Sequence, residues 1–106
     1  MNGEPMKIGA VHKARARVVL EHAGGLHARP AIKLTQLAKR FACSVWIALS
    51  EQGPWIYAKS IARVMAMKTP QMATLHFSAE GDDAELAVDA LAKLVADDFP
   101  DRSNGG

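Results

Sequence analysis

The chain contains 106 residues, of which 49% are hydrophobic and 23% charged, and its formal net charge is +2. This size suits one compact domain that folds without metals or disulfides, and the small net charge argues against the strongly basic balance of a nucleic-acid binder. The longest apolar run is interrupted by charges and too short to cross a membrane, and the single cysteine, Cys43, cannot form an internal disulfide. With no pattern of a secretory leader, these features predict a cytoplasmic protein that does not insert into membranes.

The first half of the predicted domain begins with a strand and a helix. Residues 14–20 alternate between apolar and polar side chains, which is typical of a half-buried strand, and a glycine-containing loop follows. Residues 27–42 place apolar side chains on one helical stripe. Pro30 falls in the first turn of this helix, where its missing N–H costs nothing.

The middle of the chain predicts a hairpin and a short helix. Residues 44–49 and 55–58 are rich in β-forming side chains and are separated by a loop longer than the tightest turns. The side chains expected to face the core from the first of these strands are Val45, Ile47 and Leu49. Ser60 precedes apolar residues at helical spacing, so we expect it to be the N-cap of a short amphipathic helix.

The last part of the chain predicts a strand and a long helix. Residues 72–79 alternate, and residues 81–99 carry the clearest helical stripe of the sequence. Asp82 is the expected N-cap of that helix, with Glu85 as its capping-box partner.

The order of these elements predicts an α+β fold of two layers. A four-stranded antiparallel sheet with three helices packed on one face would bury every apolar stripe. We expect residues 14–99 to form the domain. Residues 1–13 and 100–106 lack periodicity and are expected to be a flexible extension and a flexible tail.

The stretch GLHARPA, residues 25–31, places His27 at the expected start of the first long helix. The first turn of a helix has unpaired N–H groups and partial positive charge, which together favour an anion. A neutral imidazole has a free lone pair and is a nucleophile. A phosphoryl group on His27 would lie beside these N–H donors and within reach of Arg29, whose guanidinium suits phosphate. The alternative is that His27 is a helix cap or an ordinary surface residue.

GLHARPA after a strand, KSIARVMAM some thirty residues later, and SAEG before an acidic helix start together resemble the histidine-containing phosphocarrier HPr of the bacterial phosphoenolpyruvate-dependent phosphotransferase system. The resemblance covers about residues 14–98 and implies an open-faced β-sandwich. It implies that His27 accepts a phosphoryl group on Nδ1 from enzyme I and passes it to a histidine of an enzyme IIA domain, while Arg29 steadies the group. Such a protein is a carrier, needs no cofactor and is not an enzyme on its own.

The resemblance also implies regulation and a docking surface. Ser60 matches the serine that a regulatory kinase, the HPr kinase/phosphorylase, phosphorylates in that family. The residues expected to bind partner proteins are Ala28, Pro30, Lys39, Ile61, Arg63 and Met65. A regulatory binding module controlled through Ser60 is the alternative function. A nucleic-acid binder is disfavoured because basic and aromatic residues do not interleave along the sequence.

Several residues depart from the family pattern or invite other interpretations. Gly24 stands where many members have asparagine, so any hydrogen bond from that side chain must be absent or replaced. Cys43 is expected to be a small buried hydrophobic residue. The remaining histidines, His12, His22 and His76, lack metal-ligand spacing and are expected to face solvent. The aromatic residues expected on the outer face of the sheet are Trp46, Trp55 and Tyr57. We expect a monomer without a metal site, and the sequence leaves open whether it serves sugar uptake or a nitrogen-linked regulatory branch.

Overall fold

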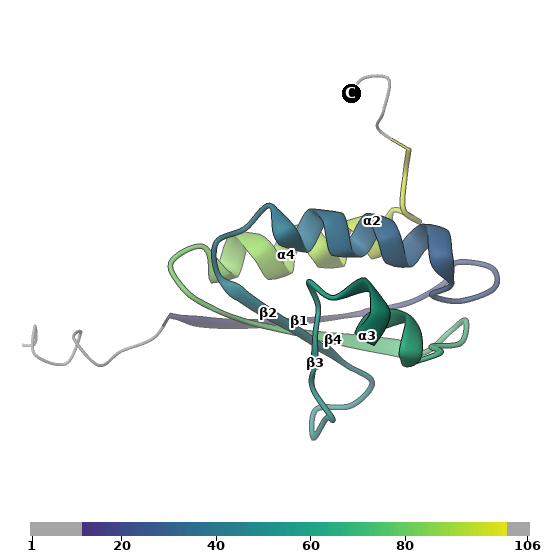
Figure 1. Cartoon of the computed structure of the whole chain (residues 1–106), viewed down its shortest axis with the longest axis horizontal. Helices are drawn as coiled ribbons and strands as arrows, with labels where there is room; N and C mark the ends of the chain where they lie inside the picture. The colour runs from purple at the N-terminus through teal and green to yellow at the C-terminus, as the bar shows by residue number, and fades with distance from the viewer. Residues whose placement is uncertain (1–11, 102–106) are drawn as a thin grey trace, which may run out of the picture.

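The computed structural model describes residues 12–101, which fold into a four-stranded antiparallel sheet with three helices (Figure 1). In chain order the elements are β1 (Lys13–Val19), α2 (Ala28–Lys39), β2 (Ser44–Ala48), β3 (Ile56–Tyr57), α3 (Ile61–Ala66), β4 (Thr74–Glu80) and α4 (Ala84–Ala96). The predicted element order and the α+β fold class are therefore confirmed. Of the predicted extension at 1–13 and tail at 100–106, residues 1–11 and 102–106 lie outside the described residues, while Lys13 is the first residue of β1.

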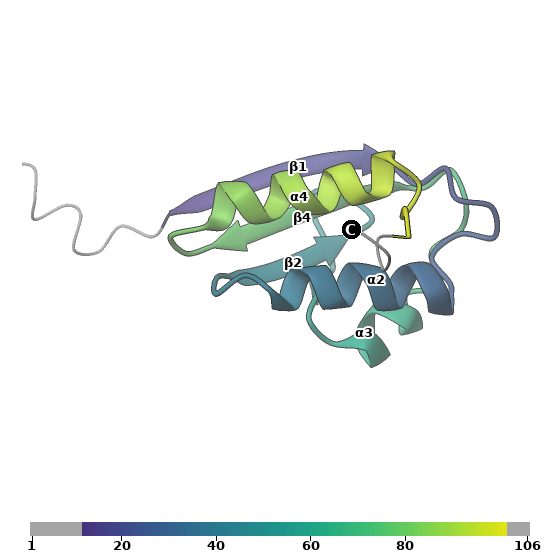
Figure 2. The same ribbon diagram turned by 90° about the horizontal axis from the view of Figure 1, so that it is seen from above.

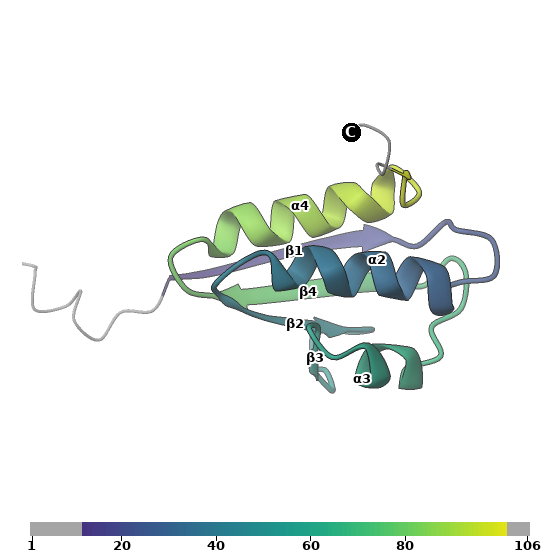
Figure 3. The ribbon, with the colours of Figure 1, turned by 45° about the horizontal axis from the view of Figure 1, so that its top comes forward.

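The sheet has the strand order β1-β4-β2-β3, and every neighbouring pair is antiparallel. Seen from above, α2 and α4 lie side by side over one face of the sheet, and α3 lies next to α2 on the side away from α4 (Figure 2). The intermediate view shows the same layers, with the start of α2 and the end of α4 at the same end of the molecule (Figure 3). This end holds the candidate site.

The core lies between the sheet and the two long helices. Leu75, Phe77 and Ala79 of β4 are fully buried, while the residues between them are half-buried on the other face, as the alternation predicts. The helical residues that meet this face are Ala31, Leu34 and Ala38 of α2 and Ala84, Ala87, Val88, Leu91 and Val95 of α4. Burying a side chain the size of Phe77 contributes about 1.5–3 kcal/mol, so each buried stripe adds several contributions of this kind to the stability of the fold.

The predicted hairpin is shorter than expected, and the inward position of Leu49 is wrong. Val45 and Ile47 are fully buried, but β2 ends at Ala48 and Leu49 is 42% exposed. The chain turns directly after Leu49, because the N–H of Gly53 donates to the Ser50 carbonyl and the Ser50 hydroxyl donates to the Gly53 carbonyl. The strand therefore ends at Ala48, one residue before the end that the sequence pattern predicts.

The predicted N-cap of α4 is also wrong. The N-cap is Asp83, not Asp82, and no capping side-chain bond forms at this helix. The Asp83 carboxylate instead accepts hydrogen bonds from the backbone N–H groups of Ala42 and Cys43, at 3.0 and 3.1 Å. Glu85 does not close a capping box. Its Oε2 instead lies 3.9 Å from Nε2 of His12. A long-range contact has thus replaced the local one that the sequence suggested.

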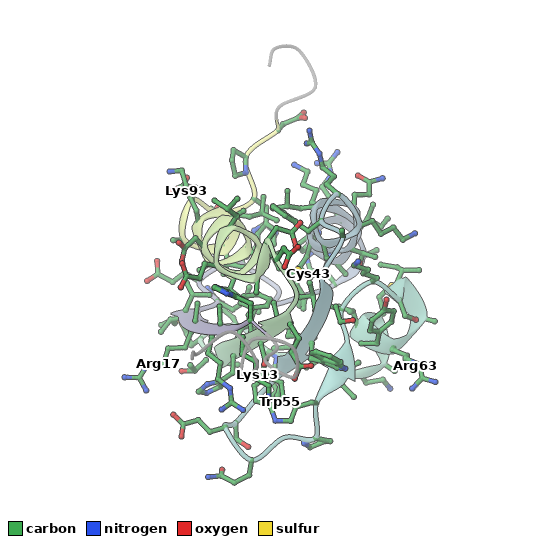
Figure 4. All side chains as sticks on the ribbon, turned by 90° about the vertical axis from the view of Figure 1, so that its left-hand side faces the viewer. Lys13, Arg17, Cys43, Trp55, Arg63 and Lys93 are labelled. Carbon is green, nitrogen blue, oxygen red and sulfur yellow. The ribbon has the colours of Figure 1, made fainter. Side chains whose placement is uncertain are left out.

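Cys43 is buried, as predicted, at the junction between the layers (Figure 4). Burial, together with the hydrogen bond and the negative charge of Asp83, raises the pKa of the Cys43 thiol to about 11. The thiol and the backbone N–H groups of Ala42 and Cys43 in turn hold the pKa of Asp83 below its usual value. The junction therefore joins the start of β2 to the start of α4.

The outer face of the sheet carries the aromatic residues, as predicted. Trp46 and Tyr57 are cross-strand partners, and Lys13, Arg17 and Trp55 lie on the side of the sheet opposite the helices (Figure 4). The guanidinium of Arg15 lies 5.1 Å from the centre of a Trp55 ring, a distance at which a cation and an aromatic ring attract. The sheet therefore pairs basic and aromatic residues that are distant along the sequence.

Candidate functional site

The loop before α2 is held by the segment that follows α3. The Leu20 N–H donates to Ala73 O, the Met72 N–H donates to Leu20 O, and the Leu26 N–H donates to Thr69 O, at 2.8, 2.6 and 3.0 Å. Gly25 has a φ of +78°, and a Cβ at this position would lie 2.3 Å from the Thr69 carbonyl oxygen. The close approach explains why glycine is required here, directly before the helix that begins at Ala28.

His27 lies at the start of α2, as the sequence predicts, and it occupies the N-cap position, but its side chain forms no capping hydrogen bond. The His27 carbonyl accepts from the Ala31 N–H at 2.9 Å, and Pro30 has no N–H to satisfy. The N–H groups of Ala28 and Arg29 find no partner among residues 12–101, and the first turn of α2 has no acidic residue. This helix start therefore offers two free donors and an uncompensated positive end of the helix dipole.

Gly24 faces one edge of the His27 ring. It is the third residue of a turn closed by the bond from Gly25 N–H to His22 O at 3.0 Å, and its φ of +85° suits glycine in that place. A Cβ at Gly24 would lie 3.0 Å from both Cδ2 and Nε2 of His27. In an imidazole, Nδ1 is the atom opposite the Cδ2–Nε2 edge. Nδ1 therefore lies on the side of the ring away from Gly24.

His22 is a neighbour of His27, and the prediction that it faces solvent is wrong. Its side chain is 25% exposed, and its Nδ1 lies 2.6 Å from Oδ1 of Asp98. The centres of the His22 and His27 rings are 5.6 Å apart. Sequence spacing gave no signal of this arrangement because Asp98 is 76 residues away along the chain. Of the other two histidines, His12 is exposed, as predicted, and His76 is half-buried on the outer sheet face.

The other residues predicted at this helix start lie on two sides of it. Ala28 and Arg29 are exposed beside His27, whereas Pro30 is buried under the helix. Arg29 forms no ion pair with any residue between 12 and 101, so its guanidinium remains available for an anion. An exposed imidazole, two free N–H groups and a guanidinium together can receive a phosphoryl group.

Ser60 is the N-cap of α3, as predicted. Its hydroxyl oxygen accepts a hydrogen bond from the Arg63 N–H at 3.3 Å, and its carbonyl accepts from the Val64 N–H. Val64 is buried, while Ile61 and Met65 are 36% and 40% exposed. Their side chains therefore form an apolar spot on the surface.

Ile32 extends this apolar surface onto α2 and was missed by sequence reasoning. It is 43% exposed, and it lies one turn after Ala28 and two turns before Lys39 on the same side of the helix. The amphipathic pattern singles out the buried stripe, so it gave no signal for an apolar residue outside that stripe. The packing of α3 beside α2 supplies the signal, because it brings a second exposed apolar helix to this side (Figure 2).

Arg63 does not lie with Ile61 and Met65. Two residues after Ile61, it points about 200° around the helix from that residue. It lines a hollow of about 300 Å³ together with Leu49, Pro54, Ile56, Ala66 and Met67. Lys33 and Arg40 of α2 line a hollow beside α4. By helical geometry Ala28 and Lys39 therefore lie on the other side of α2, where α3 exposes Ile61 and Met65 (Figure 2), whereas Arg63 lines the separate hollow.

Residues 12–101 contain neither a membrane-spanning helix nor a metal-binding cluster of side chains. No helix in this range is long and apolar enough to cross a membrane. No group of three or more histidine, cysteine or acidic side chains is placed to hold a metal ion there.

Comparison with known proteins gives consistent results. The family described as the PTS HPr component phosphorylation site matches residues 14–97. The phosphocarrier protein HPr of Cupriavidus necator is 41% identical over 75 residues, which are 71% of this chain and 82% of that protein. Among solved structures, HPr-C-His from Thermoanaerobacter tengcongensis has a TM-score of 0.74 and 34% identity, covering 81% of this chain and 94% of that one.

The chain also matches parts of longer proteins. The multiphosphoryl transfer protein of Vibrio cholerae serotype O1 is 40% identical over 85 residues, which are 79% of this chain. The chain spans 21% of that protein and 15% of the multiphosphoryl transfer protein of Haemophilus influenzae.

The family match and the structural likeness cover nearly the same stretch of chain as the sheet and its helices, and they identify a histidine-containing phosphocarrier. The chain belongs to the HPr family, the phosphocarrier proteins of the phosphotransferase system.

Proposed function

We propose that His27 accepts a phosphoryl group from phosphorylated enzyme I and passes it to a histidine of an enzyme IIA domain. The observation that carries this proposal is the start of α2, where an exposed imidazole without a capping bond stands beside free N–H donors. The protein acts as a cytoplasmic monomer and depends on each partner for the other half of the site. A purely regulatory module would need neither the exposed imidazole nor the open helix start.

The transfer is a displacement at phosphorus. The Nδ1 lone pair of His27 attacks, a bond from Nδ1 to phosphorus forms, and the bond between phosphorus and its donor atom on enzyme I breaks with its electron pair leaving on that atom. The N–H groups of Ala28 and Arg29 and the Arg29 guanidinium receive the negative oxygens. The second transfer repeats these events, with His27 as the leaving group and a histidine of the enzyme IIA domain as the nucleophile.

The partner docks on the surface shared by α2 and α3. Ile32, Ile61 and Met65 supply exposed apolar area there, and Lys39 supplies positive charge at its rim. Apolar area of this kind stabilises a complex, while rim charge mainly speeds its formation. Ser60, between β3 and this surface, is the regulatory phosphorylation site: a dianionic group there lies next to the apolar spot that a partner must desolvate.

Incubation with phosphoenolpyruvate and enzyme I tests the proposal. Wild-type protein should gain one phosphoryl group that is labile in acid and stable in base, as expected for a phosphoramidate of imidazole. His27→Ala should gain none. His12→Ala, which removes an exposed histidine at the other end of β1, is the matched control and should be labelled normally. Labelling of His27→Ala, or an unlabelled wild type, would contradict the assignment.

Comparing candidate donors then identifies the branch. Enzyme I of the sugar-transport branch and its counterpart of the nitrogen-linked branch can each be mixed with the protein and phosphoenolpyruvate. The branch in which this carrier works should label it faster at equal concentrations.

A further inference from the structure

The chain reverses tightly after α4 and returns to the candidate site. Asp98 and Phe99 both have left-handed backbone conformations, with φ of +63° and +53°, at positions where glycine is the usual residue. The Phe99 N–H donates to Leu94 O at 2.8 Å, which closes the turn. Phe99 is 5% exposed, and its backbone carbonyl accepts a hydrogen bond from Lys33 Nζ of α2 at 2.9 Å. Such conformations persist where surrounding contacts hold them, and they often occur at functional sites.

This turn holds the His22 ring from two directions. The Asp98 carboxylate accepts a hydrogen bond from Nδ1 of His22 at 2.6 Å, which fixes the ring's orientation and assigns the proton to Nδ1. The Phe99 ring meets the His22 ring edge-on, with their centres 5.5 Å apart. The backbone of His22 is fixed as well, because its carbonyl accepts from the Gly25 N–H. His22 is therefore the fixed partner in its contact with His27.

His27, by contrast, has few restraints of its own. It is exposed, its side chain forms no capping bond, and the Cδ2–Nε2 edge of its ring faces Gly24, which has no side chain to hold it. The His22 ring, tilted by 43° at 5.6 Å, is its aromatic neighbour. A nucleophile that must meet a partner's phosphorus in line gains rate from a fixed orientation.

We propose that His22, held by Asp98, is a positioning residue that keeps the His27 ring oriented with Nδ1 toward the incoming phosphoryl group. This inference rests on the proposed carrier function of His27. His22 acts through the His27 ring and not through the partner, so its loss should lower the rate of transfer within the complex and leave complex formation unchanged. Asp98 acts one step further away, through His22.

Steady-state phosphorylation by enzyme I, with this protein as the varied substrate, tests the kinetic part. His22→Leu should lower the maximal rate about tenfold with an unchanged KM, in line with the cost of misorienting a reacting group. Asp98→Asn should lower it less, because the amide oxygen still accepts from His22 without the charge. His22→Gln keeps an N–H donor for Asp98 and should recover part of the rate.

Asp97→Asn is the matched control. Asp97 is the neighbouring carboxylate at the same helix end, but its partner is Lys93, at 2.9 Å, and not His22. This variant should transfer at the wild-type rate. Melting temperatures of all variants separate a positioning role from loss of the fold. Should His22→Leu fail to fold, Asp98→Asn decides, because the Asp98 side chain is 67% exposed.

Nitrogen-15 spectra of the histidine rings give a readout without any partner. In His22→Leu and Asp98→Asn the ring signals of His27 should shift and broaden as the ring becomes mobile, and in Asp97→Asn they should not. Wild-type maximal rates in both His22→Leu and Asp98→Asn, a change in KM alone, or unchanged His27 signals would each overturn the inference. An unlabelled wild type would instead refute the carrier function, and the ring signals would still decide the positioning role.

Discussion

The helices α2 and α3 begin in different ways, although we propose that the first residue of each start, His27 and Ser60, carries a phosphoryl group. At α2, the His27 side chain forms no capping bond, and the N–H groups of Ala28 and Arg29 have no partner within the described part of the chain. At α3, the Ser60 hydroxyl is already engaged, accepting from the Arg63 N–H. The donors at α2 can therefore meet an incoming anion without first breaking a bond.

The difference separates a transfer site from a regulatory site. A group that is gained and lost in every cycle needs donors that are free in the unmodified state, since breaking an existing bond would add to the barrier. A modification that persists can replace an existing cap, because the phosphate oxygens take over the bond that the hydroxyl formed. The two helix starts thus suit a nucleophile and a switch, respectively.

Removing the guanidinium from the α2 start should have the largest effect among the following changes. Arg29→Ala should slow phosphorylation of His27 about 10²-fold, the usual cost of losing a donor to a transition-state oxygen, while the melting temperature stays near wild type because Arg29 is exposed. Stopped-flow phosphorylation by enzyme I measures the rate. Arg29→Lys should restore part of it, since a lysine lacks the bidentate fork. An alanine variant with the wild-type rate would remove Arg29 from the site.

Placing a charge at the α3 start tests the switch. Ser60→Asp should reduce the efficiency of phosphorylation by enzyme I about tenfold, equivalent to about 1.4 kcal/mol, because the carboxylate lies beside the apolar spot of Ile61 and Met65. The effect should fall on KM, and Asp is a good N-cap, so the fold should not weaken. Ser60→Thr, which keeps a neutral cap, is the control. Unaltered kinetics in Ser60→Asp would reduce Ser60 to a cap.

Stability measurements compare the two starts directly. Ser60→Ala removes a capping bond and should lower the free energy of unfolding by about 1 kcal/mol. His27→Ala removes an exposed side chain that forms no capping hydrogen bond, so the free energy of unfolding should change by less than about 0.5 kcal/mol. Urea denaturation followed by circular dichroism measures both. Equal losses for the two variants would show that His27 also stabilises its helix.

The smallest effect is expected at the rim of the docking surface. Lys39→Glu should slow association with enzyme I about threefold at low salt and make it less sensitive to salt, because exposed rim charge mainly acts on encounter. Arg63→Glu is a useful companion, since Arg63 lies on the other side of α3 and should have less effect. Association rates at two salt concentrations test this pair, and equal effects would contradict the placement of the docking surface.

The sequence was sufficient to predict structural features that depend on residues close together along the chain. The strand alternation around Leu75 and Phe77, the Ser60 cap and the helix that starts after His27 each follow from side chains within a few positions. In each case the local preference and the hydrophobic pattern agree, so no tertiary contact is needed to decide between alternatives.

Features that depend on distant residues could not be predicted in the same way. Aspartate is a common residue at the N-cap of a helix. The carboxylate of Asp83 nevertheless accepts hydrogen bonds from the backbone N–H groups of Cys43 and Ala42, which lie 40 and 41 residues away along the chain. His22 lacks any local signal, because its partner Asp98 reaches it through a turn at the other end of the chain. Both contacts arise where the folded chain brings a loop to a helix end, and sequence spacing carries no record of that proximity.

The buried Cys43 makes the protein a chemical reporter of its own opening. Because it is the one cysteine in the chain, alkylation with iodoacetamide would mark a single known position. The residue is 4% exposed and its thiol pKa is raised to about 11, so at neutral pH the closed structure withholds both access and the reactive thiolate. The alkylation rate in native buffer should therefore measure how often the start of α4 separates from β2. A phosphorylation assay does not detect this motion.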